Sequence, residues 1–494
     1  MNLAEVLSGV ALVQPLGPEL ASAEVADLQF DSRRVAPQSL FFAFPGSKAD
    51  GRQFAADALA SGALAVVGES PAPPDLAGRW IQVAHGRQAL SLAARNFFRR
   101  PDERLFLTGI TGTNGKTTTA YLIDSVLRAA GKTTAMIGTI EYHLAGRVLK
   151  AVNTTPESLD LLRLFAELES AGGTHVTMEV SSHALALGRV YGLNFHTTVF
   201  TNLTRDHLDF HGDMDTYFAA KQLLFEGAGG APPRVAVLNH EDEWAHRIQV
   251  HAETQKVWYG LGPEADLRPR HIASGFGGLR FDLQFGKQRF PIESPLIGKI
   301  NVYNILAACA VGFSYGLSAE VIARGIADLK AVPGRFERVD EGQPFVVVVD
   351  YAHTDDALRN VISVARGLNP KRVITLFGCG GDRDRAKRPL MGQAAAEASD
   401  FVVLTSDNPR SEDPLAIMND ALVGVRRFDV PHVVEPDRQA AIRRALKEAR
   451  EGDIVILAGK GHEPYQVLKD KTIDFDDRAV AREVLKGHGY RKTQ

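Results

Sequence analysis

The chain has 494 residues, of which 45% are hydrophobic and 23% charged, and its net charge is −3. This length predicts about three domains, each able to bury its own core. No apolar run approaches the ~20 residues of a membrane span, and the start Met1–Glu5 lacks the basic and apolar regions of a secretory signal. The near-neutral charge gives no general attraction to nucleic acid or anionic lipid. We therefore expect a cytoplasmic protein that binds neither membrane nor nucleic acid.

The two cysteines, Cys309 and Cys379, are too few for a disulfide framework or a zinc site. We expect both to be small, buried hydrophobic residues.

Residues 1–100 predict a small α/β domain that ends at the Arg-Arg-Pro-Asp segment 99–102. Apolar runs at 40–44 and 63–67 are typical of strands, and an alanine-rich stretch between them is typical of a helix. The triplet Asp31-Ser32-Arg33 has two interpretations. It can be a locally capped turn, or its hydroxyl and guanidinium groups can bind a diphosphate.

A glycine-rich segment at 108–119 follows an apolar strand and leads into a helical pattern. Its glycines allow the backbone to turn N–H groups toward an anion, Lys116 can reach the phosphates, and Thr117 supplies a hydroxyl for Mg²⁺. The strict phosphate-loop pattern requires a glycine where this chain has Ile110. An ordinary glycine-rich turn would also fit, but Gly-Lys-Thr between a strand and a helix favours a nucleotide site.

Strand and helix patterns alternate from residue 105 to about residue 330, which predicts parallel βαβ units with ligands at the carboxyl ends of the strands. The strand at 174–179 ends in Glu179, our first metal candidate. Two further polar segments, 153–156 and 201–209, lie at predicted strand ends. His207 in the second segment is either a metal ligand or a hydrogen-bonded structural residue, and its polar neighbours favour the former.

Lys221 lies on the apolar face of a helix predicted at 217–225, between Tyr217 and Phe225. It is either a lysine whose ammonium group reaches solvent or a buried functional residue. Another amphipathic helix begins near residue 300 and carries Asn304, and the central domain closes at the segment 332–337.

The C-terminal domain begins with the apolar strand 345–350. Further strands at 373–377, 401–405 and 454–458 each end in a charged or glycine-rich loop. Because parallel strands place their carboxyl ends at one edge of a sheet, these four loops are expected to share a site. By itself, the glycine cluster 378–381 indicates no more than a tight turn.

Together these segments resemble the Mur ligases of bacterial cell-wall synthesis over almost the whole chain. Each motif alone is weak, but their order and spacing are specific. The family's phosphate loop resembles Gly109-x-x-Gly112-x-x-Gly115-Lys116-Thr117, which accounts for Ile110. The remaining motifs are Asp31-Ser32-Arg33, Asn153-Thr154-Thr155-Pro156, Glu179-Val180-Ser181-Ser182-His183, Thr204-Arg205-Asp206-His207-Leu208-Asp209, Lys221, Asp350-Tyr351-Ala352-His353, Asp407-Asn408-Pro409-Arg410 and Gly459-Lys460-Gly461-His462-Glu463.

The resemblance implies an α/β protein of three domains: a uridine-binding domain at 1–100, a central P-loop-type ATP-binding domain with a parallel sheet at 101–333, and a Rossmann-like amino-acid-binding domain at 334–494. It implies that ATP phosphorylates the D-glutamyl γ-carboxylate of UDP-N-acetylmuramoyl-L-alanyl-D-glutamate. The amine of meso-diaminopimelate then attacks the acyl phosphate. A monomer that needs Mg²⁺ is expected.

The resemblance also implies roles for individual residues. Lys116, Glu179, His207 and Lys221 are expected to be catalytic. Mg²⁺ is expected at Thr117, Glu179, His207 and, if carbamoylated, Lys221. Expected ATP contacts are Gly112, Thr113, Asn114, Gly115, Lys116, Thr117, Thr118, Asn304, Arg335, Asp350 and His353. Expected UDP-substrate contacts are Ser32, Asn153, Thr154, Thr155, Ser181 and Arg189. Expected diaminopimelate contacts are Arg383, Asp407, Asn408, Pro409, Arg410, Gly459 and Glu463.

Arg410 carries the amino-acid assignment, because a guanidinium suits the distal carboxylate of diaminopimelate while Glu463 can meet its distal ammonium. Lysine lacks that carboxylate, so a lysine-adding relative, which is one competing hypothesis, should not keep Arg410 at this position. Leu187 stands where some relatives carry glutamine, and Thr354-Asp355 replaces a common Thr-Pro. Two further hypotheses are a folylpolyglutamate synthase, which shares the acyl-phosphate chemistry, and a nucleotide-dependent switch protein.

Overall fold

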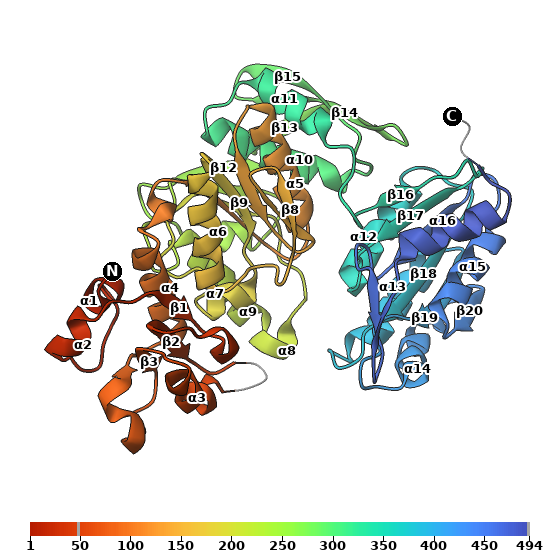
Figure 1. The fold of residues 1–494 in the computed structure, drawn as a ribbon. Coiled ribbons are helices and arrows are strands. Elements are labelled where there is room, and N and C mark those ends of the chain that lie inside the picture. The colour runs from red at the N-terminus through yellow and green to blue at the C-terminus, as the bar shows by residue number, and fades with distance from the viewer. Residues whose placement is uncertain (47–49, 492–494) are drawn as a thin grey trace.

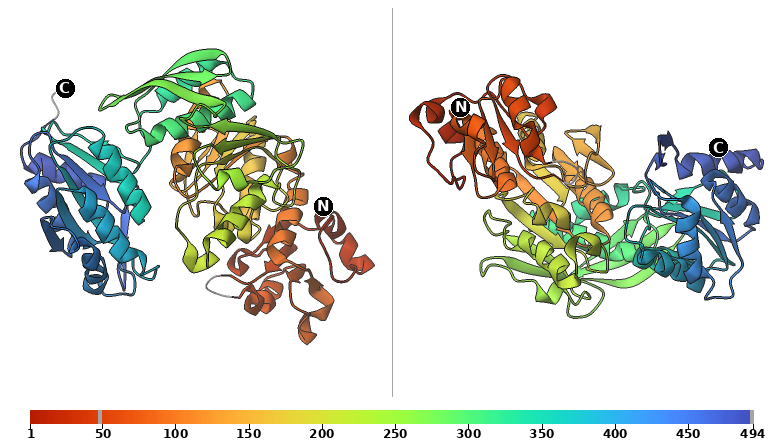
Figure 2. Two further views of the ribbon diagram at one scale, coloured as in Figure 1. Left: turned by 180° about the vertical axis from the view of Figure 1, so that it is seen from behind. Right: turned by 90° about the horizontal axis from the view of Figure 1, so that it is seen from below.

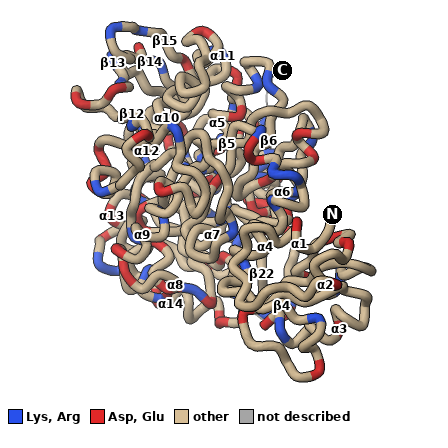
Figure 3. The backbone as a smooth tube through the Cα atoms, turned by 90° about the vertical axis from the view of Figure 1, so that its left-hand side faces the viewer, with Lys and Arg blue, Asp and Glu red and all other residues tan. Residues whose placement is uncertain are grey.

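The computed structural model describes residues 1–46 and 50–491, which form three α/β domains, each with its own sheet (Figure 1). The central domain lies between the other two, and the termini lie at opposite ends of the molecule (Figure 2). Basic and acidic residues are interspersed along the described chain (Figure 3). No helix within the described residues is long and apolar enough to cross a membrane. The predicted divisions after residues 100 and 333 lie between the sheets, and their positions stay predictions.

The N-terminal domain has four parallel strands in the order β1-β2-β3-β4. These are β1 (Asp27–Gln29), β2 (Ser39–Ala43), β3 (Ala65–Gly68) and β4 (Trp80–Gln82). Its α-helices are α1 (Leu3–Val6), α2 (Pro18–Ser22), α3 (Ala55–Ala60) and α4 (Gly86–Phe97), and short 3₁₀ helices are η1 (Ser32–Arg34), η2 (Gly51–Phe54), η3 (Pro74–Arg79) and η4 (Pro101–Glu103). Buried side chains of α4 continue into the apolar core of the central domain, which joins the two domains.

The central sheet has eleven strands in the order β15-β14-β13-β12-β11-β10-β5-β9-β6-β7-β8. The strands from β12 to β6 in this order are parallel, as predicted. Its strands are β5 (Phe106–Thr111), β6 (Thr134–Ile137), β7 (Glu141–Leu144), β8 (Arg147–Lys150), β9 (His175–Glu179), β10 (Phe195–Phe200), β11 (Val235–Asn239), β12 (Gln255–Tyr259), β13 (Leu267–Gly275), β14 (Gly278–Phe285) and β15 (Gln288–Ser294).

Both edges of this sheet are antiparallel, so the prediction of parallel units up to about residue 330 is wrong there. The chain reverses directly at Ala145-Gly146 and again near Gly278 and Gly286, where backbone φ angles are positive. Such tight turns join antiparallel neighbours, whereas a parallel neighbour requires a long crossover.

Helices cover the two faces of the central sheet in separate groups. Buried residues of α5, α10 and α11 form one core, and those of α6 and α9 belong to the core on the other face. The helices of this domain are α5 (Lys116–Ala129), α6 (Ser158–Ser170), α7 (Ser182–Ala186), α8 (Leu208–His211), α9 (Met214–Phe225), α10 (Ile300–Ser314) and α11 (Ala319–Asp328), with a 3₁₀ helix η5 (Ala245–Arg247).

The C-terminal domain has a six-stranded sheet in the order β16-β17-β21-β18-β19-β20, of which only β16 is antiparallel to its neighbour. The four predicted strands are confirmed as β17, β18, β19 and β21. Its strands are β16 (Glu337–Val339), β17 (Val346–Asp350), β18 (Val373–Cys379), β19 (Phe401–Ser406), β20 (His432–Glu435), β21 (Ile454–Ala458) and a hairpin of β22 (Tyr465–Val467) and β23 (Thr472–Asp474). Its helices are α12 (Asp355–Arg366), α13 (Lys387–Ala398), α14 (Pro414–Val425), α15 (Arg438–Glu448) and α16 (Asp477–Gly487).

The cysteine prediction is confirmed: Cys309 in α10 and Cys379 at the end of β18 are buried and unpaired.

A buried ion pair supports the carboxyl edge of the C-terminal sheet. Arg438 and Asp477 both have fully buried side chains and form two hydrogen bonds, of 2.8 and 2.6 Å. The same guanidinium donates to the carbonyl oxygens of Ser406 at 3.3 Å and Ala458 at 2.9 Å. These carbonyls end β19 and β21, directly before the two loops that carry all the predicted amino-acid contacts except Arg383.

We predict that Asp477→Ala lowers the free energy of unfolding by about 3–5 kcal/mol, because it leaves the Arg438 guanidinium buried without its anion. Chemical denaturation of the full chain, followed by circular dichroism, measures this loss. Asp215→Ala is the matched control, since Asp215 forms an exposed ion pair with Arg247. Equal, small effects of both substitutions would contradict the prediction.

Candidate active site

The phosphate loop joins the central strand β5 to α5, which begins at Lys116. Gly112 and Gly115 have φ angles of +139° and +87°, and a Cβ at Gly112 would lie 1.9 Å from the Thr201 hydroxyl oxygen. Lys116 Nζ donates to the carbonyl oxygens of Gly112 at 2.9 Å and Thr113 at 2.8 Å. The surrounding protein removes water from the ammonium and lowers the pKa of Lys116. The loop, the positive end of α5 and Lys116 therefore form an anion site.

Three of the predicted metal ligands, Thr117, Glu179 and His207, line one cavity of about 300 Å³ beside this loop. Glu179 is 1% exposed, and its carboxylate accepts hydrogen bonds from the backbone N–H of Thr139 at 2.9 Å and from its hydroxyl at 3.0 Å. Thr117 Oγ1 accepts from Arg335 at 3.2 Å. Desolvation lowers the pKa of His207 to about 4, which leaves its imidazole neutral at neutral pH.

This donor set fits a magnesium ion. Carboxylate and hydroxyl oxygens suit Mg²⁺, which keeps several waters and takes further ligands from substrate phosphates. The described residues contain no cluster of three or more His, Cys, Asp or Glu side chains that would enclose a metal alone. Thr117 and Glu179 would therefore hold Mg²⁺ together with phosphate oxygens. His207 lines the same cavity, and its role as a ligand stays a prediction.

Lys221 lies behind the phosphate loop and is only 1% exposed, so the interpretation of its ammonium as solvent-reaching is wrong. Its Nζ donates to the carbonyl oxygen of Gly112 at 3.0 Å and lies 4.4 Å from the centre of the Tyr217 ring. Burial, followed by the positive charge of Lys116, lowers the pKa of Lys221 well below its ordinary value. Lys221 can be buried on the apolar face of its helix because the carbonyl oxygen of Gly112 accepts a hydrogen bond from its ammonium group.

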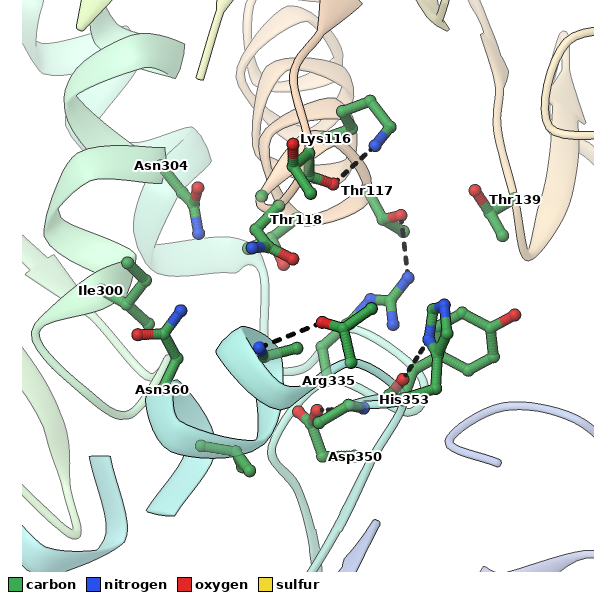
Figure 4. Close-up of a pocket in the computed structure, with 18 of the residues that line it drawn as sticks. Lys116, Thr117, Thr118, Thr139, Ile300, Asn304, Arg335, Asp350, His353 and Asn360 are labelled. Carbon is green, nitrogen blue, oxygen red and sulfur yellow. Dashed lines mark hydrogen bonds between the residues drawn. The ribbon is translucent and has the colours of Figure 1, made fainter. Parts of the chain in front are cut away.

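The start of the C-terminal domain closes the same cavity from the opposite side (Figure 4). The Arg335 guanidinium lies 4.7 Å from the centre of the Tyr351 ring. Asp350 accepts hydrogen bonds from the backbone N–H groups of Phe336 at 2.7 Å and Ala352 at 2.8 Å, and burial raises the pKa of its carboxyl group. Asp350 thus fixes the two segments that present Arg335 and His353.

The cavity continues between α10, which carries the predicted ATP contact Asn304, and α12, where the sequence indicated no site. Asn304 Oδ1 faces Gly115 and accepts a hydrogen bond from Thr119 at 3.3 Å. Asn360 projects from α12 on the same side (Figure 4). In sequence, Asn360 is an ordinary polar residue of an amphipathic helix. The aliphatic walls of this part are Ile297, Ile300, Val361 and Val364.

A second cavity, of about 710 Å³, lies between the central and C-terminal domains. It joins the first cavity through shared lining residues: Thr154, Ser181, Asp206, His207, Tyr351, His353 and Thr354. The central domain contributes the predicted substrate contacts Asn153, Thr154, Thr155, Ser181 and Arg189, as well as Leu187. The C-terminal domain contributes Arg383, Asp407, Asn408, Arg410, Gly459 and Glu463.

Four predicted site residues are not among the described residues that line these cavities: Ser32, Gly112, Lys221 and Pro409. Gly112 and Lys221 lie directly behind Lys116. Ser32 begins η1 in the N-terminal domain. There the Asp31 carboxylate accepts from the backbone N–H of Arg33 and pairs with its guanidinium at 2.7 Å, so the capped-turn interpretation of this triplet holds. Diphosphate binding by Ser32 stays a prediction.

The glycine cluster after β18 does more than form a turn, because it packs against the loop after β19. The backbone N–H of Gly381 donates to Asn408 O at 2.9 Å, and Arg410 NH1 donates to Gly381 O at 2.7 Å. A Cβ at Gly381 would lie 1.9 Å from Pro409 O. Similarly, a Cβ at Gly459, where φ is +110°, would lie 2.7 Å from Asp407 Oδ2. Only glycine lets these loops approach so closely.

A single tyrosine orders the loop of the predicted UDP-substrate contacts. The hydroxyl of Tyr142 in β7 donates to Asn153 O at 2.5 Å and accepts from the backbone N–H groups of Val152 at 3.2 Å and Asn153 at 3.1 Å. Nearby, Arg189 donates to Glu157 at 3.0 Å and to Thr155 O at 3.0 Å. No motif in the sequence singled out Tyr142.

Comparisons with known proteins agree with this geometry. A model of the Mur ligase middle domain matches residues 110–312, one of the Mur ligase glutamate ligase domain matches 334–461, and one of the Mur ligase family catalytic domain matches 24–98. The chain belongs to the Mur ligase family.

Curated relatives include the UDP-N-acetylmuramoyl-L-alanyl-D-glutamate--2,6-diaminopimelate ligase of Solibacter usitatus (strain Ellin6076), which is 83% identical over 100% of both chains. The ligase of the same name from Geobacillus kaustophilus (strain HTA426) is 47% identical over 94% of this chain and 96% of its own. A solved structure of a ligase of that name matches with a TM-score of 0.71 and 32% identity over 99% of both chains. A solved structure of Mycobacterium tuberculosis folylpolyglutamate synthase, complexed with ADP and AMPPCP, matches with a TM-score of 0.62. Its sequence is 18% identical over 82% of this chain and 96% of its own, so this match shows a shared fold alone.

We predict that Tyr142→Phe loosens the loop of the predicted UDP-substrate contacts, because Val152 and Asn153 lose the acceptor of their N–H groups. The net loss of about 1 kcal/mol per hydrogen bond corresponds to roughly fivefold faster exchange. Hydrogen–deuterium exchange of peptides covering residues 147–157 measures it. Tyr303→Phe is the control, since the Tyr303 hydroxyl forms no hydrogen bond within the described chain. Unchanged exchange in Tyr142→Phe would show that the hydroxyl does not hold the loop.

Proposed function

We propose that the protein is an ATP-dependent amide ligase of peptidoglycan precursor synthesis. It joins meso-2,6-diaminopimelate to the D-glutamyl γ-carboxylate of UDP-N-acetylmuramoyl-L-alanyl-D-glutamate. The observation that carries this proposal is the 83% identity, over the full length, with a ligase named for this reaction. The two joined cavities support it, since one side presents a phosphate loop and the other presents Arg383, Arg410 and Glu463.

The chemistry needs several anionic oxygens in one cleft. The γ-phosphoryl group of ATP passes to the substrate carboxylate, which forms an acyl phosphate and releases ADP. The amine then attacks the acyl carbon, and inorganic phosphate leaves the tetrahedral intermediate. Lys116 and the N-terminus of α5 stabilise the phosphate charge and hold the reactants in line, which is the main contribution a protein makes to phosphoryl transfer. Mg²⁺, when bound, neutralises further phosphate charge.

The proposed nucleotide position follows from the shape of the first cavity. In this position the phosphates of the nucleotide lie at the phosphate loop. The base lies between α10 and α12, where aliphatic side chains can cover both faces of its ring. Asn304 and Asn360 offer amide groups at this end. We also propose that the enzyme is cytoplasmic, that it is a monomer and that it depends on Mg²⁺.

Lys221 is proposed to act as a carbamate. The neutral amine of a lysine, which a lowered pKa favours, can react with carbon dioxide. The product is an anionic oxygen group, which suits a site beside Mg²⁺, whereas an ammonium there would repel the ion.

Competing functions make different demands on the site. An L-lysine-adding enzyme would leave Arg410 without the distal carboxylate that a guanidinium fork suits. Folylpolyglutamate synthase shares the fold at 18% identity, but a similarity at that level does not indicate a shared substrate. A nucleotide-dependent switch would not need the second cavity between the domains.

The proposal predicts that phosphate release and UDP-tripeptide formation require both the UDP-dipeptide and meso-diaminopimelate, and that L-lysine is a poor replacement. Chromatography of the products with each amino acid tests this. Turnover without either substrate would favour a switch, and preference for L-lysine would overturn the amino-acid assignment.

In the same assay, Arg410→Ala should raise the KM for meso-diaminopimelate about tenfold to a hundredfold, from the loss of charge-assisted hydrogen bonds. Arg385→Ala in the neighbouring loop is its control.

We predict that Lys221→Ala lowers activity by about a hundredfold, as loss of a group that tunes a metal site does. Acetate or formate should restore part of it, because a small carboxylate can supply the anionic oxygen. Steady-state rates with and without the acids measure the effect, with the exposed Lys132→Ala as control. Activity retained in Lys221→Ala, with no effect of the acids, would exclude the carbamate.

A further inference from the structure

Lys460 is a fully buried lysine that the proposed reaction does not use. It follows β21 and Gly459, and its side chain is 0% exposed. Its Nζ donates to Asn408 Oδ1 at 3.2 Å and to Glu463 Oε2 at 3.0 Å, and lies 3.7 Å from Asp407 Oδ1. The ammonium therefore sits directly behind three of the predicted amino-acid contacts.

The hydrogen bonds of Lys460 determine how two of these side chains face the cavity. Asn408 Oδ1 also accepts from the backbone N–H of Val467 at 2.9 Å, so its Nδ2 is directed to Glu463 Oε2 at 3.0 Å. Both hydrogen bonds to the Glu463 carboxylate within the described chain thus fall on Oε2. Oε1 is left for a ligand in the cavity that Glu463 lines.

Lys460 also changes the charge of the amino-acid site, which we define as Arg383, Asp407, Asn408, Arg410, Gly459 and Glu463. Its two guanidinium groups and two carboxylates balance each other. Lys460 adds one positive charge within 4 Å of both carboxylates. Because the Lys460 side chain is fully buried, its charge is weakly screened by solvent.

The distal end of meso-diaminopimelate carries a carboxylate and an ammonium, whereas the distal end of L-lysine carries an ammonium alone. The added positive charge of Lys460 disfavours a lone ammonium at this site more than a neutral pair of charges. We infer that Lys460 is a specificity-determining residue, which selects a zwitterionic distal end over a cationic one. The inference rests on the proposed function, because it requires that this site bind the incoming amino acid.

The test compares kcat/KM for meso-diaminopimelate and for L-lysine at saturating ATP and UDP-dipeptide. Lys460→Met removes the charge and the hydrogen bonds at similar length, and Lys460→Gln removes the charge but keeps donors. We expect the ratio of the two kcat/KM values to fall at least tenfold in both variants, with the KM for ATP unchanged. Lys447→Met, which removes an exposed lysine of the same domain, should keep the wild-type ratio.

Two results would overturn the inference. One is a parallel fall of kcat/KM for both amino acids, which a general structural role would produce. The other is a wild-type ratio in Lys460→Gln, which would mean that hydrogen bonding and not charge matters. If Lys460→Met does not fold, Lys460→Gln decides alone. A wild-type enzyme that does not ligate meso-diaminopimelate would instead overturn the proposed function, and the inference with it.

Discussion

Hydrogen bonds between the C-terminal domain and the phosphate loop are the contacts on which the whole site depends. Asp356 in the first turn of α12 accepts from Asn114 Nδ2 at 2.8 Å and from Thr204 Oγ1 at 3.0 Å. Arg335 donates to Thr117, one residue after Lys116. These contacts bring the carboxyl edges of two separate sheets together. Since phosphoryl and acyl transfer depend on positioning, neither domain alone presents a complete site.

Buried lysines give this cleft its electrostatic character. Lys116 and Lys221 both donate to the carbonyl oxygen of Gly112, at 2.9 and 3.0 Å. Two ammonium groups at one acceptor repel each other, and this repulsion adds to burial in lowering the pKa of Lys221. Lys460, by contrast, lies within 4 Å of two carboxylates, those of Asp407 and Glu463. According to its neighbours, the same residue type is thus proposed to bind phosphate, to form a carbamate and to select the substrate.

Features encoded over short stretches of sequence could be predicted. The phosphate loop, the buried strands of the C-terminal domain and the polar loops after them are local patterns, and parallel topology places their ends at one edge. The antiparallel edges of the central sheet were missed. The alternation of strand and helix patterns along this domain fits parallel crossovers, but the chain forms short hairpins at residues 145–146 and 286. Tyr142 and Asp356 were missed as well, since no motif marks them and their partners Val152 and Asn114 lie 10 and 242 residues away.

The sequence by itself determined the family, the phosphate chemistry and the residue types that each loop presents, because these follow from motif order and from charge and hydrogen-bonding capacity. Only the tertiary structure decided which of those groups meet. It buried Lys221 against Gly112 instead of letting it reach solvent, and joined the two cavities at shared residues such as His207 and Tyr351. The physical reason is that burial and partner distance, which set pKa and binding geometry, arise from packing between segments far apart in the chain.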